Sequence, residues 1–88
     1  MKLIICILQD HDRDPVSKAL NEQGYRVTVL PSSGAYFRRG NSTLLIGVQA
    51  EQVEQAVQTI KDNCAEPEEP GLRRATVFVI SVDRFEQP

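Results

Sequence analysis

The sequence predicts an α+β fold in which a four-stranded antiparallel sheet carries two helices on one face. Four short segments rich in apolar and β-branched residues, at 2–8, 25–30, 42–48 and 75–82, predict the strands. Two segments with helical periodicity separate the first strand from the second and the third from the fourth. The resulting order, βαββαβ, is that of a ferredoxin-like fold. The 88 residues suffice for one such domain, which we expect to span residues 1–88.

The first strand and the first helix are predicted from a change of period. Residues 2–8 form an almost continuous apolar run that ends at Gln9. The following helix is expected to begin at Pro15, because the Asp14 carboxylate can cap free amides and proline is tolerated at the first helical position. Gly24 is placed to end this helix in a left-handed conformation.

The remaining elements follow the same two periods. Residues 25–30 alternate as the second strand, and residues 42–48 form the third. Apolar residues from Val53 to Ile60 recur at helical spacing and indicate a second helix that runs to about Cys64. Residues 65–71 then form an acidic loop with two prolines, which we expect to be poorly ordered without a partner, because prolines and like charges leave it few ways to pack.

A polar loop at residues 31–41 carries adjacent aromatics, Tyr36 and Phe37, followed by adjacent arginines, Arg38 and Arg39. Aromatic faces beside guanidinium groups and glycine amides suit a nucleotide, whose base can stack while its phosphates accept hydrogen bonds. The alternative is a hairpin loop whose aromatic side chains fill a subunit contact. These residues alone leave both interpretations open.

The strands also indicate self-association. With both helices on one face of the sheet, the other face is expected to be polar. The first, third and last strands are instead apolar at odd and even positions alike, as Ile5 beside Cys6 and Phe78 beside Val79 illustrate. Since the chain has no further element to cover the second face, we expect copies of it to associate through the sheet.

Charge and composition narrow the class of function. The formal net charge of −2 provides no general attraction to nucleic acid or to an anionic membrane. No apolar run approaches the ~20 residues that span a bilayer, and the N-terminal segment lacks a signal-peptide layout. Two cysteines without CxxC spacing fit a reducing cytoplasm. A cytoplasmic protein that binds neither nucleic acid nor membrane is therefore expected.

Catalysis and metal binding have little support in the sequence. His11 has no serine or cysteine indicated beside it, and Cys6 is predicted to lie in the core. A cation could be bound by His11, Asp12 and Asp14 together. A cluster that caps the following helix and forms the turn before it explains these residues with fewer assumptions, and we favour this explanation. The sequence therefore predicts a binding module that is not an enzyme and has neither a metal nor a cofactor.

Short motifs along nearly the whole chain resemble those of the PII-like cyclic di-AMP receptor proteins of bacteria. They lie at residues 1–4, 9–12, 26–28, 33–34, 40–43, 46–48 and 75–79. The resemblance implies a PII-like homotrimer that binds cyclic di-AMP in three clefts between neighbouring subunits. It also implies a role in signal transduction through an unknown downstream protein.

The resemblance further implies a set of ligand-binding residues. Two residues on the second strand would face the ligand, and the amides of three loop residues would approach its base or phosphate. An asparagine at the end of the loop would hydrogen-bond a base edge. A glycine on the third strand would allow the backbone to approach the ligand closely. These residues are Arg26, Thr28, Ala35, Tyr36, Phe37, Asn41 and Gly47. Each also has an ordinary structural explanation, such as β-propensity at Thr28 or a bulge at Gly47.

Three features depart from the family's pattern. Residues 34–37 read Gly-Ala-Tyr-Phe where the family usually has Gly-Gly-Phe-Leu, and the loop before the last strand is much shorter. The pair Arg38 and Arg39 is more basic than the family's usual pattern, and this pair favours another anionic nucleotide. We expect a trimeric PII-like signalling protein that binds cyclic di-AMP or a related nucleotide. The alternative is a trimeric PII-like interaction scaffold that has lost nucleotide binding, or one that binds another nucleotide such as ATP.

Overall fold

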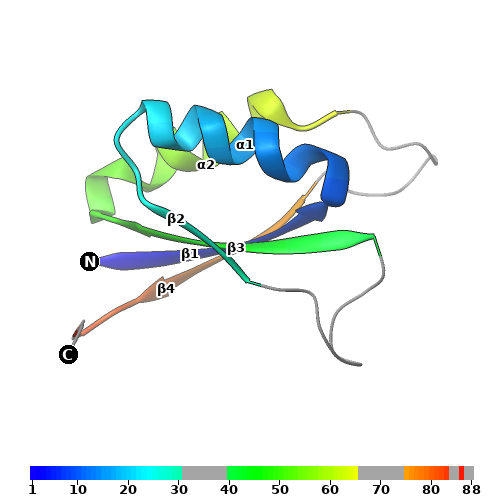
Figure 1. Cartoon of the computed structure of the whole chain (residues 1–88). Coiled ribbons are helices and arrows are strands. Elements are labelled where there is room, and N and C mark those ends of the chain that lie inside the picture. The colour runs from blue at the N-terminus through cyan, green and yellow to red at the C-terminus, as the bar shows by residue number, and fades with distance from the viewer. Residues whose placement is uncertain (31–39, 66–74, 84–85, 87–88) are drawn as a thin grey trace.

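The computed structural model describes residues 1–30, 40–65, 75–83 and 86. It has two layers, a sheet and a pair of helices that both lie on one side of it (Figure 1). The elements, in chain order, are β1 (Lys2–Gln9), α1 (Asp10–Glu22), β2 (Val27–Leu30), β3 (Asn41–Val48), the short 3₁₀ helix η1 (Ala50–Gln52), α2 (Val53–Asn63) and β4 (Ala75–Ser81). Neither α1 nor α2, the two α-helices of the described part, is long and apolar enough to cross a membrane.

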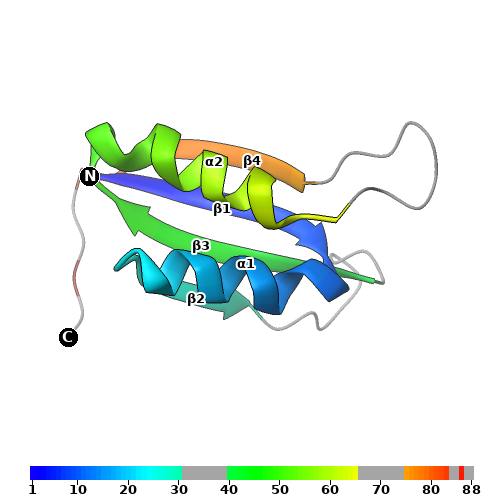
Figure 2. The ribbon, with the colours of Figure 1, turned by 90° about the horizontal axis from the view of Figure 1, so that it is seen from above.

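The sheet has the strand order β2-β3-β1-β4, and every neighbouring pair is antiparallel. Strand β1 is therefore central and pairs with β3 on one side and β4 on the other, so that Ile4 stands opposite Ile46 and Val79. Seen from above, α1 and α2 lie side by side over the strands (Figure 2). The predicted α+β architecture, with four antiparallel strands and two helices on one face, is confirmed.

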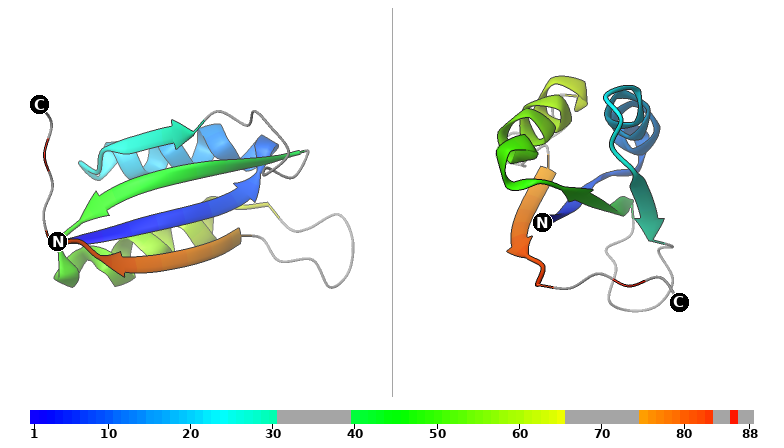
Figure 3. Two further views of the ribbon diagram at one scale, coloured as in Figure 1. Left: turned by 90° about the horizontal axis from the view of Figure 1, so that it is seen from below. Right: turned by 90° about the vertical axis from the view of Figure 1, so that its left-hand side faces the viewer.

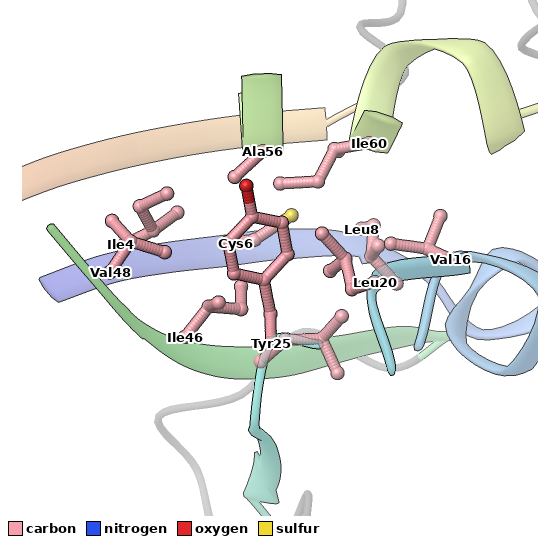
Figure 4. Packing of buried hydrophobic residues seen from close by; sticks show 11 residues of the cluster. Ile4, Cys6, Leu8, Val16, Leu20, Tyr25, Ile46, Val48, Ala56 and Ile60 are labelled. Atoms are coloured by element: carbon pink, nitrogen blue, oxygen red, sulfur yellow. The ribbon is translucent and has the colours of Figure 1, made fainter. Parts of the chain in front are cut away.

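The core lies between the sheet and the helices. It is built from alternate residues of β1 and β3 and from the inner stripes of the two helices, because a strand presents every second side chain to one face. The buried residues are Ile4, Cys6, Leu8, Val16, Leu20, Tyr25, Leu44, Ile46, Val48, Ala56 and Ile60. Figure 4 shows the Tyr25 ring among these side chains, and its hydroxyl donates to Oε1 of Gln55 on α2 at 2.8 Å.

Helix α1 begins at Asp10, so the prediction that it begins at Pro15 is wrong. The Asp10 amide donates to the Gly40 carbonyl at 2.9 Å, which ties the first residue of the helix to the start of β3. Pro15 lies inside the helix and can give no amide hydrogen bond to the His11 carbonyl one turn earlier. Tertiary contacts of the first turn therefore outweigh the local signal of an aspartate followed by a proline.

Helix α1 ends at Glu22, and Gly24 terminates it in a left-handed conformation as predicted. Gly24 has a φ of +91°, its amide donates to the Asn21 carbonyl at 3.0 Å, and the Tyr25 amide donates to the Leu20 carbonyl at 3.1 Å. These two bonds form a Schellman motif, in which the residue with positive φ is usually glycine. The motif holds Tyr25 against Leu20 in the core, so that β2 begins only at Val27, two residues later than predicted.

Among the described residues, no helix lies on the second face of the sheet, as the view from below shows (Figure 3). By the pairing register, the side chains on this face include Leu3, Ile5 and Ile7 of β1 and, on β4, Phe78 and Ile80, which are 52% and 46% exposed. The predicted apolar second face is therefore present in the single chain. Isolated exposed apolar residues are ordinary, but a contiguous group of this kind indicates a contact surface.

We predict that Gly24→Ala lowers the free energy of unfolding by about 1–2 kcal/mol, because an L-residue in the left-handed conformation places Cβ too close to the following carbonyl. Denaturant unfolding at one protein concentration would measure the change. Glu22→Ala, two residues earlier at an exposed helical position, is the matched control and should stay within about 0.5 kcal/mol of wild type. Equal stability of the two variants would contradict the role assigned to Gly24.

Candidate functional site

A depression on the open face lies at the end of the sheet where β1 begins. Its volume is about 490 Å³, within the range of small-molecule sites, ~300–1,000 Å³. It is lined by residues from the starts of β1 and β2, from the second half of β3 and from the end of β4: Met1, Lys2, Leu3, Arg26, Thr28, Leu45, Gly47 and Val82. The depression therefore combines a largely apolar wall with the polar side chains of Arg26, the residue before β2, and of Thr28 within β2.

The strand register creates this depression. Gly47 stands opposite Leu3 on β1, and because Val27 pairs with Ile46, Arg26 stands beside Gly47 on the other side. The missing side chain of Gly47 thus leaves a notch between Leu3 and Arg26. The pairing of β3 with β1 runs without interruption through Gly47, so the alternative of a bulge at this position is wrong.

Two of the three polar side chains that line the depression have no partner among the described residues. Arg26 and Thr28 are both exposed, and neither side chain has a hydrogen-bond or ion-pair partner among the described residues. A guanidinium group can form two parallel charge-assisted hydrogen bonds with a phosphate, and a hydroxyl can donate and accept. Lys2, by contrast, donates from Nζ to Oγ of Ser81 at 2.7 Å.

Three of the predicted ligand-binding residues thus line one depression, namely Arg26, Thr28 and Gly47. Asn41 lies at the other end of β3, paired with Gln9, and six residues of extended strand place it ~20 Å from Gly47. The structure therefore does not bring Asn41 to the depression of its own chain.

The other three predicted residues, Ala35, Tyr36 and Phe37, lie outside the described residues, as does most of the acidic loop at 65–71. Sequence reasoning missed the apolar residues of the wall, Met1, Leu3, Leu45 and Val82. In the sequence they belong to ordinary apolar strand patterns, and only the register places them around the glycine notch.

The carboxylates that precede Pro15 have a different role from the predicted cap. Oδ1 of Asp10 accepts from the Ser42 hydroxyl at 2.5 Å, and no side chain caps the start of α1. Asp12 is 2% exposed, and its Oδ1 accepts from the Ala65 amide at 3.0 Å. These two carboxylates join the first turn of α1 to the start of β3 and to the end of α2.

The sequence also leaves open a cation site formed by His11, Asp12 and Asp14, and the structure shows how these side chains lie. His11 Nε2 lies 3.5 Å from the Asp12 Oδ1 that already accepts from Ala65, while Asp14 is exposed and pairs with Arg13 at 3.2 Å. Within the part of the chain that the structure describes, no three His, Cys, Asp or Glu side chains gather so as to hold a metal ion. The Asp10 and Asp12 carboxylates therefore accept hydrogen bonds that join distant segments of the same chain.

Cys6 lies in the core, as predicted, and is not suited to act as a nucleophile. It is fully buried on the helix-covered side of β1. Burial, together with the nearby Cys64 thiol, raises the pKa of Cys6 from 9.0 to about 12. A thiol reacts through its thiolate, so this cysteine is protonated and inert at neutral pH.

We therefore expect Cys6 of the native protein to resist alkylation by iodoacetamide at pH 8. With a pKa of about 12, only about one molecule in 10,000 carries the thiolate at that pH, and the sulfur is also shielded from the reagent. Peptide mapping by mass spectrometry would locate the label, and the same reaction in denaturant provides the control. Labelling of Cys6 at the same rate in both conditions would show that the thiol is accessible.

A family model and a solved structure both match this chain. A family model described as "Cyclic-di-AMP receptor" matches residues 1–70, which include all seven predicted ligand-binding residues. A solved structure, the crystal structure of a functionally unknown protein from Pediococcus pentosaceus ATCC 25745, is similar with a TM-score of 0.76 and 34% sequence identity, over 98% of this chain and 95% of that chain. The family model covers most of the chain, and the predicted resemblance is confirmed: this chain belongs to the cyclic-di-AMP receptor family.

Proposed function

We propose that this protein is a homotrimeric receptor that binds cyclic di-AMP in clefts between its subunits and signals the bound state to a downstream protein. The observation that carries the proposal is the family match together with the position of Arg26, Thr28 and Gly47 around one depression. The family supports a binding role for cyclic di-AMP. The depression supports this part of the chain as the binding site.

The chemistry of the depression suits a cyclic dinucleotide. Such a ligand offers two purine faces and two phosphodiesters, so its site needs apolar surface and a cation. Leu3 and Leu45 supply apolar surface on which a purine face can pack. Arg26, which has no partner among the described residues, supplies a fork for a phosphodiester. The Thr28 hydroxyl can donate to a phosphate oxygen or to a ring nitrogen.

The separation of Asn41 from the depression supports a site shared between subunits. If both Asn41 and Arg26 contact one ligand, the ~20 Å between the ends of β3 must be bridged by a neighbouring copy rather than within one chain. The apolar open face gives a reason for such copies to associate, since Ile5, Phe78 and Ile80 are left uncovered by the helices. In the proposed trimer, the contact between copies covers this face, and the end of β3 of one chain lies near the depression of the next.

The ligand is tested by calorimetric titration of wild type, Arg26→Ala and Asn41→Ala with cyclic di-AMP and with ATP. We expect Arg26→Ala to weaken cyclic di-AMP binding by roughly tenfold to a hundredfold, because it removes a hydrogen bond to a charged group worth about 1.5–3 kcal/mol. Asn41→Ala should weaken binding roughly tenfold, through loss of one hydrogen bond and the unmet partner on the ligand.

Lys18→Ala is the matched control, because it removes a cation from an exposed position of α1 on the other side of the sheet, and it should bind as wild type does. Absence of binding heat with both nucleotides would overturn the receptor proposal in favour of the interaction scaffold. Heat with ATP alone would leave the site in place and change the messenger.

The assembly is tested separately, by sedimentation velocity. Wild type should sediment as three copies, whereas Ile5→Asp should give monomer or aggregate, because the substitution buries an uncompensated charge in the contact between copies. Asn21→Asp, which adds the same charge at an exposed position of α1, should remain a trimer. A wild-type protein that is monomeric at all concentrations would refute this assembly.

A further inference from the structure

The Met1 side chain lies over the glycine notch of the depression. A Cβ atom built at Gly47 would be 3.3 Å from Cε of Met1, closer than an ordinary van der Waals contact, so a side chain at Gly47 would crowd the methyl group of Met1. Gly47 has no need of positive φ, which Gly24 and Gly40 adopt instead. The absence of a side chain at this position therefore serves the close approach of another group, and in this structure that group is the end of Met1.

Met1 is fixed at its backbone and free at its tip. Its carbonyl accepts a hydrogen bond from the Val82 amide at 3.0 Å, which attaches it beside the end of β4. The residue is nevertheless 49% exposed. Because methionine is unbranched and has a flexible, polarizable thioether, its tip can move at little energetic expense and packs favourably on aromatic rings.

We propose that the Met1 side chain is a movable wall of the ligand site, which fills the notch over Gly47 in the free protein and repacks against a purine base when the ligand binds. This proposal rests on the proposed function and deepens it. It assigns the base to the apolar half of the depression, formed by Met1, Leu3 and Leu45, and the phosphodiester to Arg26. Met1 thereby favours ligands with a flat aromatic group over simple phosphates.

The chain offers a direct test, because Met1 is its single methionine. Protein labelled with [methyl-¹³C]methionine gives one methyl signal, which reports on the depression alone, and an intact mass first establishes that Met1 is retained. Titration with cyclic di-AMP should shift this signal through the ring current of the base, and the shift should saturate at the concentration where the calorimetric heat saturates. Ribose 5-phosphate, which has a phosphate but no base, should leave the signal in place.

Gly47→Ala provides the second measurement. The added methyl group would crowd Cε of Met1, so the signal of the free variant should move, and cyclic di-AMP should bind at least roughly tenfold more weakly because the notch is filled. The backbone conformation accepts alanine, so a thermal melt should show a folded protein. Lys18→Ala should match wild type in signal position, shift and affinity.

Each outcome separates this proposal from the one on which it rests. Binding heat with a methyl signal that stays in place, or removal of Met1 from the purified protein without loss of affinity, would overturn the role of Met1 and leave the receptor proposal standing. Absence of both heat and shift would overturn the two proposals together. Heat and shift that saturate together, with both lost or weakened in Gly47→Ala, would support the movable wall.

Discussion

The register of β1 between β3 and β4 is the constraint on which both faces of this protein depend. Ile4 is aligned with Ile46 and Val79, and this row faces the helices, where Ile4 and Ile46 are fully buried. A slip of one residue would turn the buried row outward and lose its apolar burial, so the core fixes the register strongly. The next row, with Leu3 opposite Gly47, is thereby fixed on the open face. The geometry of the depression is thus a by-product of how the core packs.

Sequence patterns were sufficient for the strands, their order and the end of α1, because each depends on local chemistry. Apolar residues repeat with a period of two in a strand and near four in a helix, and a glycine in left-handed conformation follows a helix end. Each of these signals lies within a few residues of sequence. The start of α1 was mispredicted because its determinants are distant. The bonds of Asp10 to Gly40 and Ser42, and of Asp12 to Ala65, join residues that are 30 to 53 positions apart, and no local pattern announces them.

The candidate site divides in the same way between what a sequence carries and what it does not. Arg26, Thr28 and Gly47 were identified through motifs, and the register explains why they lie together. The apolar wall could not be predicted from the sequence, because Leu3 and Leu45 fit the apolar pattern of any half-buried strand. Asn41 shows the converse case, because its motif predicts a ligand contact while the structure places it ~20 Å from the depression of its own chain.

The hydrogen bond from the Ala65 amide to Asp12 has a consequence for how this fold can vary. Residues 66–74 begin beside this bond and end where Ala75 pairs with Leu8, only four positions from Asp12 along the chain. Both ends of the connection are therefore fastened to the same corner of the molecule. Between fixed ends, each doubling of a flexible connection costs only ~0.6 kcal/mol in closure entropy. Connections of different length can therefore be accommodated at this corner at a small cost in the free energy of folding, while the sheet stays the same.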